Sequence, residues 1–315
     1  MFHVKHGGLR TCVFFFRLFH VKHAKGSKMV SGKQLKYAAN PYIINFAAKW
    51  SSLQIRNKEQ VTMGKTISIV NQKGGVGKST TCVNLAASLH EAGKRVLICD
   101  FDPQANATSG MGVDKGTVSP NIYDVLINGA EAARAIVSTP YGDILPSNKA
   151  LAGAGIEMIG LERREYRLKD ALDAVSGSYD FILVDCPPSL ELLTLNALCA
   201  AQTVIVPVQC EYYALEGLSD LMGTIRIVKR SLNPAVELEG VLLTMYDGRT
   251  NLSMQVAEEV KRHFPGKVYA TVIPRNVRLS EAPSHGKPVL AYDPYSRGCE
   301  AYQALAAELI AKNPA

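Results

Sequence analysis

This chain of 315 residues has few closely spaced cysteines and few long apolar runs. Its first part also has few acidic residues. The seven cysteines never occur as Cys-x-x-Cys, and most stand in apolar stretches. An odd number at scattered spacings, without a secretory signal, predicts reduced thiols in a cytosolic protein rather than a disulfide framework. No stretch of about 18 apolar residues is present, so the sequence predicts no membrane span.

Acidic residues are nearly absent from residues 1–62, which hold 11 Lys or Arg and a single acidic residue, Glu59. That segment therefore carries +10, and the whole-chain charge of +7 leaves −3 for residues 63–315. The main part of the chain is not globally basic, so any nucleic-acid surface on it must be a local patch. Its length allows a sizeable core.

A glycine-rich stretch stands between a predicted strand, residues 67–70, and a predicted helix, residues 79–92. Its glycines let successive backbone N–H groups surround an anion, and the start of the helix adds its positive end. Lys78 is then placed to reach the β and γ phosphates of ATP, and the Ser79 hydroxyl to hold Mg²⁺. This arrangement predicts a P-loop.

The loop departs from the common P-loop spacing at its first position, where Gln72 replaces a glycine. The motif is the variant Lys-Gly-Gly-x-Gly-Lys-Ser, which begins with a second lysine, Lys73. A turn that merely links a strand to a helix is the simpler alternative. The lysine, the hydroxyl and both flanking elements occur together, however, and this favours the phosphate-binding interpretation.

Carboxylates end two further predicted strands, residues 95–100 and 179–185. Ligands bind at the carboxyl edge of a parallel sheet, so Asp102 is expected to orient an attacking water and Asp100 to support Mg²⁺ or Lys78. The alternative is that both merely cap a turn. Asp185 ends an apolar strand before two prolines, as in a Walker B motif, and is expected to hold a Mg²⁺-bound water.

The rest of the chain continues to alternate between strands and helices. Strands are predicted at 203–208, 240–244 and 268–273, and helices at 214–229 and 252–264. This alternation predicts an α/β fold of the P-loop NTPase type, with a mostly parallel twisted sheet flanked by helices on both faces. Residues 63–315 are expected to form one domain.

Five motifs carry a family resemblance: Lys-Gly-Gly-Val-Gly-Lys-Ser-Thr, Asp-Phe-Asp-Pro-Gln-Ala-Asn-Ala-Thr-Ser-Gly, Val-Asp-Cys-Pro-Pro-Ser, Val-Gln-Cys-Glu-Tyr-Tyr-Ala-Leu-Glu-Gly-Leu and Val-Ile-Pro-Arg-Asn-Val-Arg-Leu-Ser-Glu-Ala-Pro-Ser-His-Gly. From Met63 nearly to the C-terminus the chain resembles the chromosomal ParA (Soj) family of partition ATPases. The resemblance implies an ATPase that dimerises around two ATP molecules and, as that dimer, binds double-stranded DNA without sequence preference. It also implies release when a ParB-type partner stimulates hydrolysis, a cytoplasmic, nucleoid-associated location, and no stable membrane contact.

The resemblance also assigns roles to single residues. Lys73 would reach across the dimer to the partner's phosphates, and Gly74 would lie at the dimer face. Arg249 and Arg278 would hold DNA phosphates, although exposed, solvated arginines are the simpler alternative. The expected catalytic residues are Lys73, Lys78 and Asp102, and the expected metal site comprises Ser79, Asp102 and Asp185. The expected nucleotide-binding residues are Lys73, Gly74, Gly75, Val76, Gly77, Lys78, Ser79, Thr80, Pro274, Arg275 and Asn276, the last three around the adenine.

Residues 1–62 lie outside the resemblance and are expected to be a disordered extension or a start-site artefact. Phe-His-Val-Lys occurs twice, at 2–5 and 19–22, and TTTCACGTGAAA, one way to encode it, is its own reverse complement. With the neighbouring codons both copies fit TGTTTCACGTGAAACA, which resembles the parS sites that ParB binds. We therefore predict that this segment is upstream DNA translated from an early start, with Met63 as the natural beginning. An organellar transit peptide is the alternative on composition, whereas a His-based metal site lacks further ligands.

Rival functions predict features that can be compared with this chain. A MinD-like membrane-surface ATPase would end in a basic amphipathic helix. Here the apolar stripe Leu305, Leu309 and Ile310 of the last helix has acidic neighbours and is expected to pack on the sheet. An iron–sulfur carrier would need paired cysteines, and a helix-turn-helix regulator would need an amphipathic helix pair in the first 62 residues. The sequence supports neither.

Overall fold

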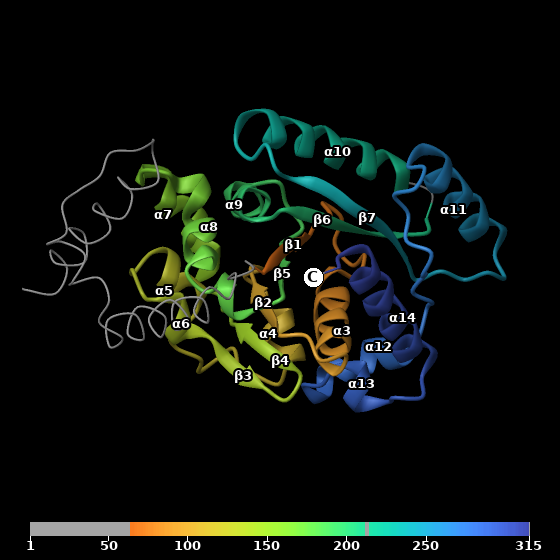
Figure 1. The fold of residues 1–315 in the computed structure, drawn as a ribbon, viewed down its shortest axis with the longest axis horizontal. Helices are drawn as coiled ribbons and strands as arrows, with labels where there is room; N and C mark the ends of the chain where they lie inside the picture. The colour runs from red at the N-terminus through yellow and green to blue at the C-terminus, as the bar shows by residue number, and fades with distance from the viewer. Residues whose placement is uncertain (1–63, 212–213, 315) are drawn as a thin grey trace, which may run out of the picture. The chain divides into compact units, whose positions relative to one another are not determined.

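The computed structural model describes residues 64–211 and 214–314 (Figure 1). Residues Thr62–Ala315 form one unit, separate from Met1–Val61. The predictions for residues 1–62 and for a natural start at Met63 lie outside the described residues.

A seven-stranded sheet forms the centre of the domain, in the order β3-β4-β2-β5-β1-β6-β7. Only the pairing of β3 with β4, at one edge, is antiparallel. This confirms the predicted mostly parallel α/β fold. The strands are β1 (Lys65–Ile69), β2 (Val96–Asp100), β3 (Val137–Thr139), β4 (Gly142–Leu145), β5 (Phe181–Asp185), β6 (Thr203–Gln209) and β7 (Glu237–Thr244).

Helices cover both faces of the sheet (Figure 1). One apolar cluster joins the sheet to α3, α4, α12, α13 and α14, and the other joins it to α5 through α11. The α-helices are α3 (Lys78–Glu91), α4 (Asn106–Gly110), α5 (Ile122–Leu126), α6 (Ala132–Ala135), α7 (Leu151–Glu157), α8 (Arg167–Asp173), α9 (Leu192–Ala200), α10 (Ala214–Ser231), α11 (Asn251–His263), α12 (Val277–Glu281), α13 (Val289–Tyr292) and α14 (Arg297–Lys312). Short 3₁₀ helices are η3 (Met158–Gly160), η4 (Arg164–Tyr166), η5 (Ser176–Ser178) and η6 (Ala282–His285).

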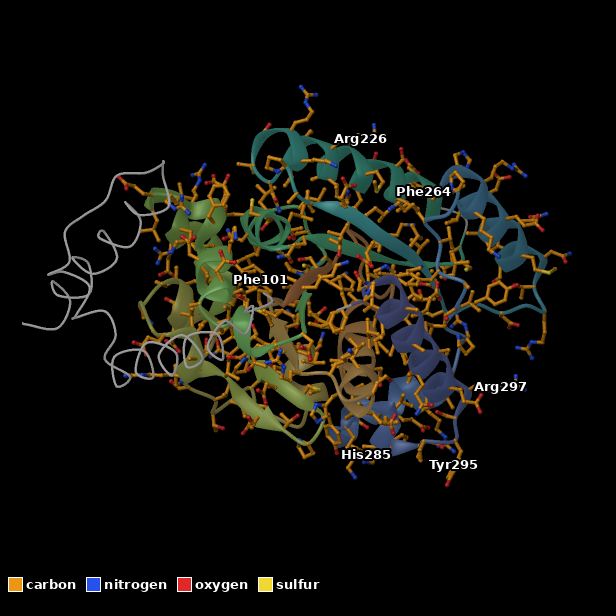
Figure 2. All side chains as sticks on the ribbon, in the orientation of Figure 1. Phe101, Arg226, Phe264, His285, Tyr295 and Arg297 are labelled. Carbon is orange, nitrogen blue, oxygen red and sulfur yellow. The ribbon has the colours of Figure 1, made fainter. Side chains whose placement is uncertain are left out.

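The two apolar clusters follow from the alternation of side chains along each strand. In β1, Ile67 and Ile69 face α3 and α14, whereas in β5 Ile182 and Val184 face the opposite layer. Side chains pointing to both faces are buried, so the strands read as continuous apolar runs. Figure 2 shows Phe101, directly after β2, in the interior, whereas Tyr295 and Arg297 lie at the periphery.

The apolar stripe of helix α14 packs inside the domain. Leu305 and Leu309 are fully buried in the cluster that contains α3, as predicted. Ser296 caps the helix by accepting a hydrogen bond from Cys299 N at 3.2 Å. Among the described residues, no helix is both long and apolar enough to cross a membrane.

The predicted strand at residues 268–273 is wrong. This segment runs beside β7 and exchanges backbone hydrogen bonds with it, but it forms only isolated bridges at Val268 and Pro274. Between them the Tyr269 ring packs over Gly240 so closely that a Cβ on this glycine would lie 2.6 Å from the ring. The ring is accommodated where regular pairing is interrupted.

Helix α4 and the end of η6 approach each other through two glycines. Gly112 and Gly286 both have positive φ, at +80° and +62°. A Cβ on Gly112 would lie 3.0 Å from Gly286 O, and one on Gly286 would lie 3.1 Å from Gly112 Cα. Backbone therefore packs directly on backbone, and neither position has room for a side chain.

Candidate nucleotide-binding site

The site begins with the register of the central strands. Asp185 of β5 pairs with Ile69 of β1 on one side and with Asp100 of β2 on the other. The carboxyl ends of all three strands thus lie at one level. Helix α3 follows β1 on one face of the sheet and α9 follows β5 on the other, which opens the crevice where ligands bind in such sheets.

The loop from β1 to α3 is held in the shape that the glycines permit. Gly75 and Gly77 take φ values of +73° and +91°, which disfavour other residues. Asn71 fixes the start of the loop, since its side chain accepts from Lys73 N at 2.9 Å and donates to Pro207 O at 2.7 Å. The Thr244 hydroxyl of β7 donates to Val76 O at 2.9 Å. The loop is therefore anchored from two neighbouring strands.

Lys78 lies in the loop as a buried cation. Its side chain is nearly inaccessible, and Nζ donates to Lys73 O at 2.9 Å. Burial lowers the pKa of Lys78, while the neighbouring carboxylate of Asp185 opposes that shift. A buried ammonium in a loop of this shape is suited to phosphate oxygens.

Asp185 provides the test of whether the site fits Mg²⁺. Its carboxylate is fully buried, and among the described residues neither oxygen has a hydrogen bond of regular geometry. Burial, and then the charge of Asp100, raise the pKa of Asp185 well above its usual range, and the nearby Ser79 hydroxyl and then the charge of Lys78 oppose them. Such an orphaned carboxylate is costly unless a cation or ordered water compensates for it. The site therefore fits a divalent cation.

The described residues contain no cluster of three or more His, Cys, Asp or Glu side chains arranged to hold a metal ion. Mg²⁺ usually takes one or two protein ligands, with phosphate oxygens and water as the others. Ser79 lines the pocket beside Lys78 and Asp102. The residues present are therefore suited to Mg²⁺ held together with a nucleotide.

Asp100 and Asp102 differ in surroundings. Asp102 lines the pocket, whereas Asp100 is fully buried and accepts from Thr108 N and Thr108 Oγ1, both at 2.7 Å. Burial raises the pKa of Asp100 to about 6, although the hydrogen bonds from Thr108 oppose the shift. Both oxygens thus accept hydrogen bonds from the loop that follows β2, and the support of Mg²⁺ or Lys78 by Asp100 stays a prediction.

Two adjoining pockets make up the site. The larger, about 570 Å³, is lined by Gly74, Gly75, Gly77, Lys78, Ser79, Thr80 and Asp102 among others. The second, about 280 Å³, contains the three predicted adenine residues Pro274, Arg275 and Asn276. Thr80 and Gly77 line both pockets. The structure thus brings segments that lie about 200 residues apart in the chain to one nucleotide-sized site.

Met245 and Pro283 also line both pockets, and sequence reasoning did not single them out. Met245 follows the last residue of β7 and has a φ of +50°, which is unusual for a residue with a side chain. The sequence feature that could have identified Met245 is its place directly after Thr244, the polar residue at the carboxyl end of that strand.

Arg249 and Arg278 lie outside both pockets. Arg249 is almost fully exposed and forms a two-pronged ion pair with Asp247, at 2.9 and 2.7 Å. Arg278 is about half exposed and contacts Glu281 at 2.8 Å and Asp293 at 3.1 Å. Their place on the surface is compatible with phosphate contacts, but each arginine also has a carboxylate partner.

Comparison with known proteins adds sequence relatives. The family model described as an AAA domain matches residues 64–238. The sporulation initiation inhibitor protein Soj of Bacillus subtilis (strain 168) is 59% identical over 251 residues, which cover 79% of this chain and 99% of that protein. The chromosome partitioning protein ParA of Myxococcus xanthus (strain DK1622) is 51% identical over 254 residues, with 80% and 90% covered.

Solved structures give the same picture. A protein named cobyrinic acid a,c-diamide synthase from Mycobacterium smegmatis, with bound ADP and magnesium, matches with a TM-score of 0.70 and 38% identity over 80% of this chain and 97% of its own. The cell division ATPase MinD of Pyrococcus furiosus matches with a TM-score of 0.66 and 29% identity, over 79% and 100% of the two chains. Both are similar to this chain along nearly the whole of their own length.

Proposed function

Because this chain belongs to the Soj/ParA family of chromosome-partitioning ATPases, we propose that it is a nucleotide-controlled switch that tethers itself to DNA. In this proposal two copies close around two ATP molecules, and the dimer binds double-stranded DNA without sequence preference. A ParB-type partner then stimulates hydrolysis to ADP and phosphate, and the dimer leaves the DNA. The family resemblance seen in the sequence is confirmed, whereas dimerisation and DNA binding belong to the proposal.

The observation that carries this proposal is the open phosphate end of the pocket. Gly74 and Gly75 line the pocket and are exposed, and a Cβ on Gly74 would meet nothing within 4 Å. Efficient hydrolysis of ATP requires that bulk water be excluded and that charge on the γ phosphate be neutralised. A second copy that covers this edge would do both, since it would bring its own Lys73 to the phosphates.

The residues of one copy divide the remaining work. Lys78 and the loop amides bind the β and γ phosphates, and Asp102 orients the attacking water. When bound, Mg²⁺ neutralises phosphate charge; Ser79 would hold it, with Asp102 at the same site and Asp185 acting through a bound water.

The decisive experiment is binding of a non-specific DNA duplex at several salt concentrations with ATP, ADP or no nucleotide. Binding that requires ATP, weakens with salt and persists in Asp102→Ala is expected, because this variant should bind ATP while hydrolysing it roughly a hundredfold more slowly. Residues 1–62 carry +10 and can bind DNA by charge alone, so the full chain must be compared with residues 63–315.

Binding that ignores the nucleotide in both forms, or that is absent, would remove the central step of this proposal. Recruitment to liposomes by ATP would then favour the MinD-like alternative. The burial of Leu305 and Leu309 of α14 in the core argues against that alternative, because it leaves them unavailable to a membrane.

For residues 1–62 we propose translation from upstream DNA that contains two ParB-binding sites. The repeated pentapeptide Phe-His-Val-Lys-His, at 2–6 and 19–23, supports this proposal. Codons that do not spell the palindrome in both copies would refute it, as would a cellular protein whose first residue by mass spectrometry is Met1.

A further inference from the structure

Three buried residues around the Asp102 loop, residues 102–108, share one hydrogen-bond network, and two of them, Thr108 and Ser147, have no role assigned above. Asp100 ends β2, Thr108 lies in α4, and Ser147 follows β4. All three are completely buried. Neither Thr108 nor Ser147 lines the nucleotide pocket.

The carboxylate of Asp100 ties the two ends of the loop together. One oxygen accepts from Asp102 N at 3.2 Å, and the other accepts from Thr108 N and Thr108 Oγ1, both at 2.7 Å. A single buried side chain therefore spans residues 102–108. Charge-assisted hydrogen bonds of this kind are stronger than neutral ones.

Ser147 holds the same loop from the neighbouring strand. Its N–H donates to Thr108 Oγ1 at 2.9 Å, and its hydroxyl donates to Asp102 O at 2.9 Å. The Thr108 hydroxyl thus donates to Asp100 while it accepts from Ser147. The backbone of Asp102 is fixed at its N–H by Asp100 and at its carbonyl by Ser147.

The loop between these anchors is strained. Ala105 has a φ of +53°, in the left-handed region that an alanine rarely adopts, and it is fully buried. Ala105 N donates to Asp102 O, and Gln104 N donates to Asp102 Oδ1, both at 2.9 Å. Strain of this kind persists only where the surroundings over-determine the backbone, and the hydrogen bond from Gln104 N ties the Asp102 carboxylate to this strained loop.

We propose that Thr108 and Ser147, with Asp100, are positioning residues for ATP hydrolysis: they hold Asp102 where it can orient the attacking water. The inference rests on the proposed role of Asp102. A shift of about 1 Å in a catalytic group can lower the rate a hundredfold. A buried network that contacts Asp102 but not the nucleotide therefore controls the rate of hydrolysis through the position of Asp102.

The test is Thr108→Val, which keeps the shape of the side chain but removes the hydroxyl shared by Asp100 and Ser147. In the full chain with Mg²⁺ and ATP, the single-turnover hydrolysis rate is expected to fall roughly ten- to a hundredfold. The dissociation constant for ATP should stay within about twofold, because no pocket residue has changed. Thr108→Ser, which keeps the hydroxyl, should restore the rate.

Ser147→Ala provides an independent test if Thr108→Val fails to fold, and it should slow hydrolysis in the same way. The matched control is Ser296→Ala. Ser296 is also buried, and its hydroxyl also donates to a backbone carbonyl, Asp293 O at 2.8 Å, but in the cap of α14. It should lower the melting temperature without slowing hydrolysis.

Wild-type rates in Thr108→Val and Ser147→Ala would overturn the inference, and so would an equal loss of ATP affinity and rate that Thr108→Ser does not rescue. Asp102→Ala separates this outcome from failure of the proposed function. A slow Asp102→Ala beside fast network variants refutes only the network, whereas a fully active Asp102→Ala refutes the role of Asp102 itself.

Discussion

At the scale of single residues, the phosphate loop divides its glycines between two tasks. Gly75 and Gly77 are needed for their positive φ values. Gly74 has no such backbone constraint, and nothing within 4 Å of its Cβ position would oppose a side chain. Neither its backbone conformation nor the neighbouring atoms of its own chain therefore require a glycine here, which is compatible with the proposed contact between two copies.

Gly74→Val should fold, because no atom of the chain lies within 4 Å of the Cβ position; its affinity for ATP must be measured as well, because Gly74 lines the nucleotide pocket. It should fail to form the ATP-dependent dimer, which sedimentation velocity with a slowly hydrolysed ATP analogue would detect. Gly75→Val is the matched control, since its φ of +73° makes the valine strained, and it should lose stability as well. A dimer of normal strength in Gly74→Val would contradict the assignment of this edge.

At the scale of elements, hydrogen bonds join the C-terminal end of α14 to the amino ends of β1 and β7. The nucleotide pocket lies at the other ends of the strands, the carboxyl ends. Glu239 of β7 accepts from Lys65 of β1 and from Asn313 Nδ2, the latter at 2.9 Å. Burial alone would raise the pKa of Glu239, but the hydrogen bonds from Lys65 and Asn313 outweigh it and leave the pKa below its usual range. The ionised form therefore favours the folded state.

This pKa shift predicts how stability depends on pH. The contribution of Glu239 is fully present above the pKa of an unfolded glutamate, about 4.3, and is lost as pH falls through the lower folded-state pKa. Glu239→Gln should lower the free energy of unfolding by roughly 1–2 kcal/mol at pH 7, with the difference shrinking below about pH 4. Urea unfolding at several pH values measures this. Glu258→Gln, on the exposed face of α11, is the control for removal of one negative charge.

The sequence predicted some strands better than others. The strands with β-branched runs, such as β1 and β5, are nearly at their predicted bounds, because burial on both faces leaves a continuous apolar signal. The short strands β3, at the edge of the sheet, and β4, between β3 and β2, were not predicted, and β3 is only partly buried. The segment 268–273 has the composition of a strand, but it pairs with β7 only at isolated bridges, which local sequence pattern does not reveal.

The candidate site was predictable in part for a related reason. Motifs at the carboxyl ends of strands identify pocket residues because parallel topology brings those ends together. Ser147, by contrast, follows the unpredicted β4, and its contacts with Thr108 and Asp102 depend on the fold. Met245 likewise reaches both pockets only because β7 ends beside the phosphate loop.

At the scale of the whole molecule, a charge of −3 on residues 63–315 means that DNA can be attracted only by a local patch. Arg249 is a candidate for that patch, but its guanidinium is already engaged by Asp247. If Arg249 holds DNA as proposed, a DNA phosphate would have to compete with that carboxylate, which would weaken binding and speed release.

Asp247→Asn should therefore strengthen ATP-dependent DNA binding by roughly threefold at moderate salt, since an exposed ion pair contributes up to about 1 kcal/mol. Arg249→Ala in the same background should remove the gain. Asp114→Asn is the control for general charge, because Asp114 accepts from Gly116 N at 2.8 Å but has no ion pair among the described residues. An equal gain in both variants, measured by fluorescence anisotropy, would show that only net charge matters.

The contact between Gly112 and Gly286 connects two segments that the proposal gives different tasks. Gly112 lies just beyond α4, which follows the Asp102 loop. Gly286 lies just beyond η6, and η6 directly follows α12, the helix that carries Arg278. Because main chain presses on main chain there, no intervening side chain can rotate or compress to absorb a small movement. Loss of the γ phosphate would then move the segment around Asp102 and the segment that carries Arg278 together. In the proposed function, release of DNA would need no separate conformational step.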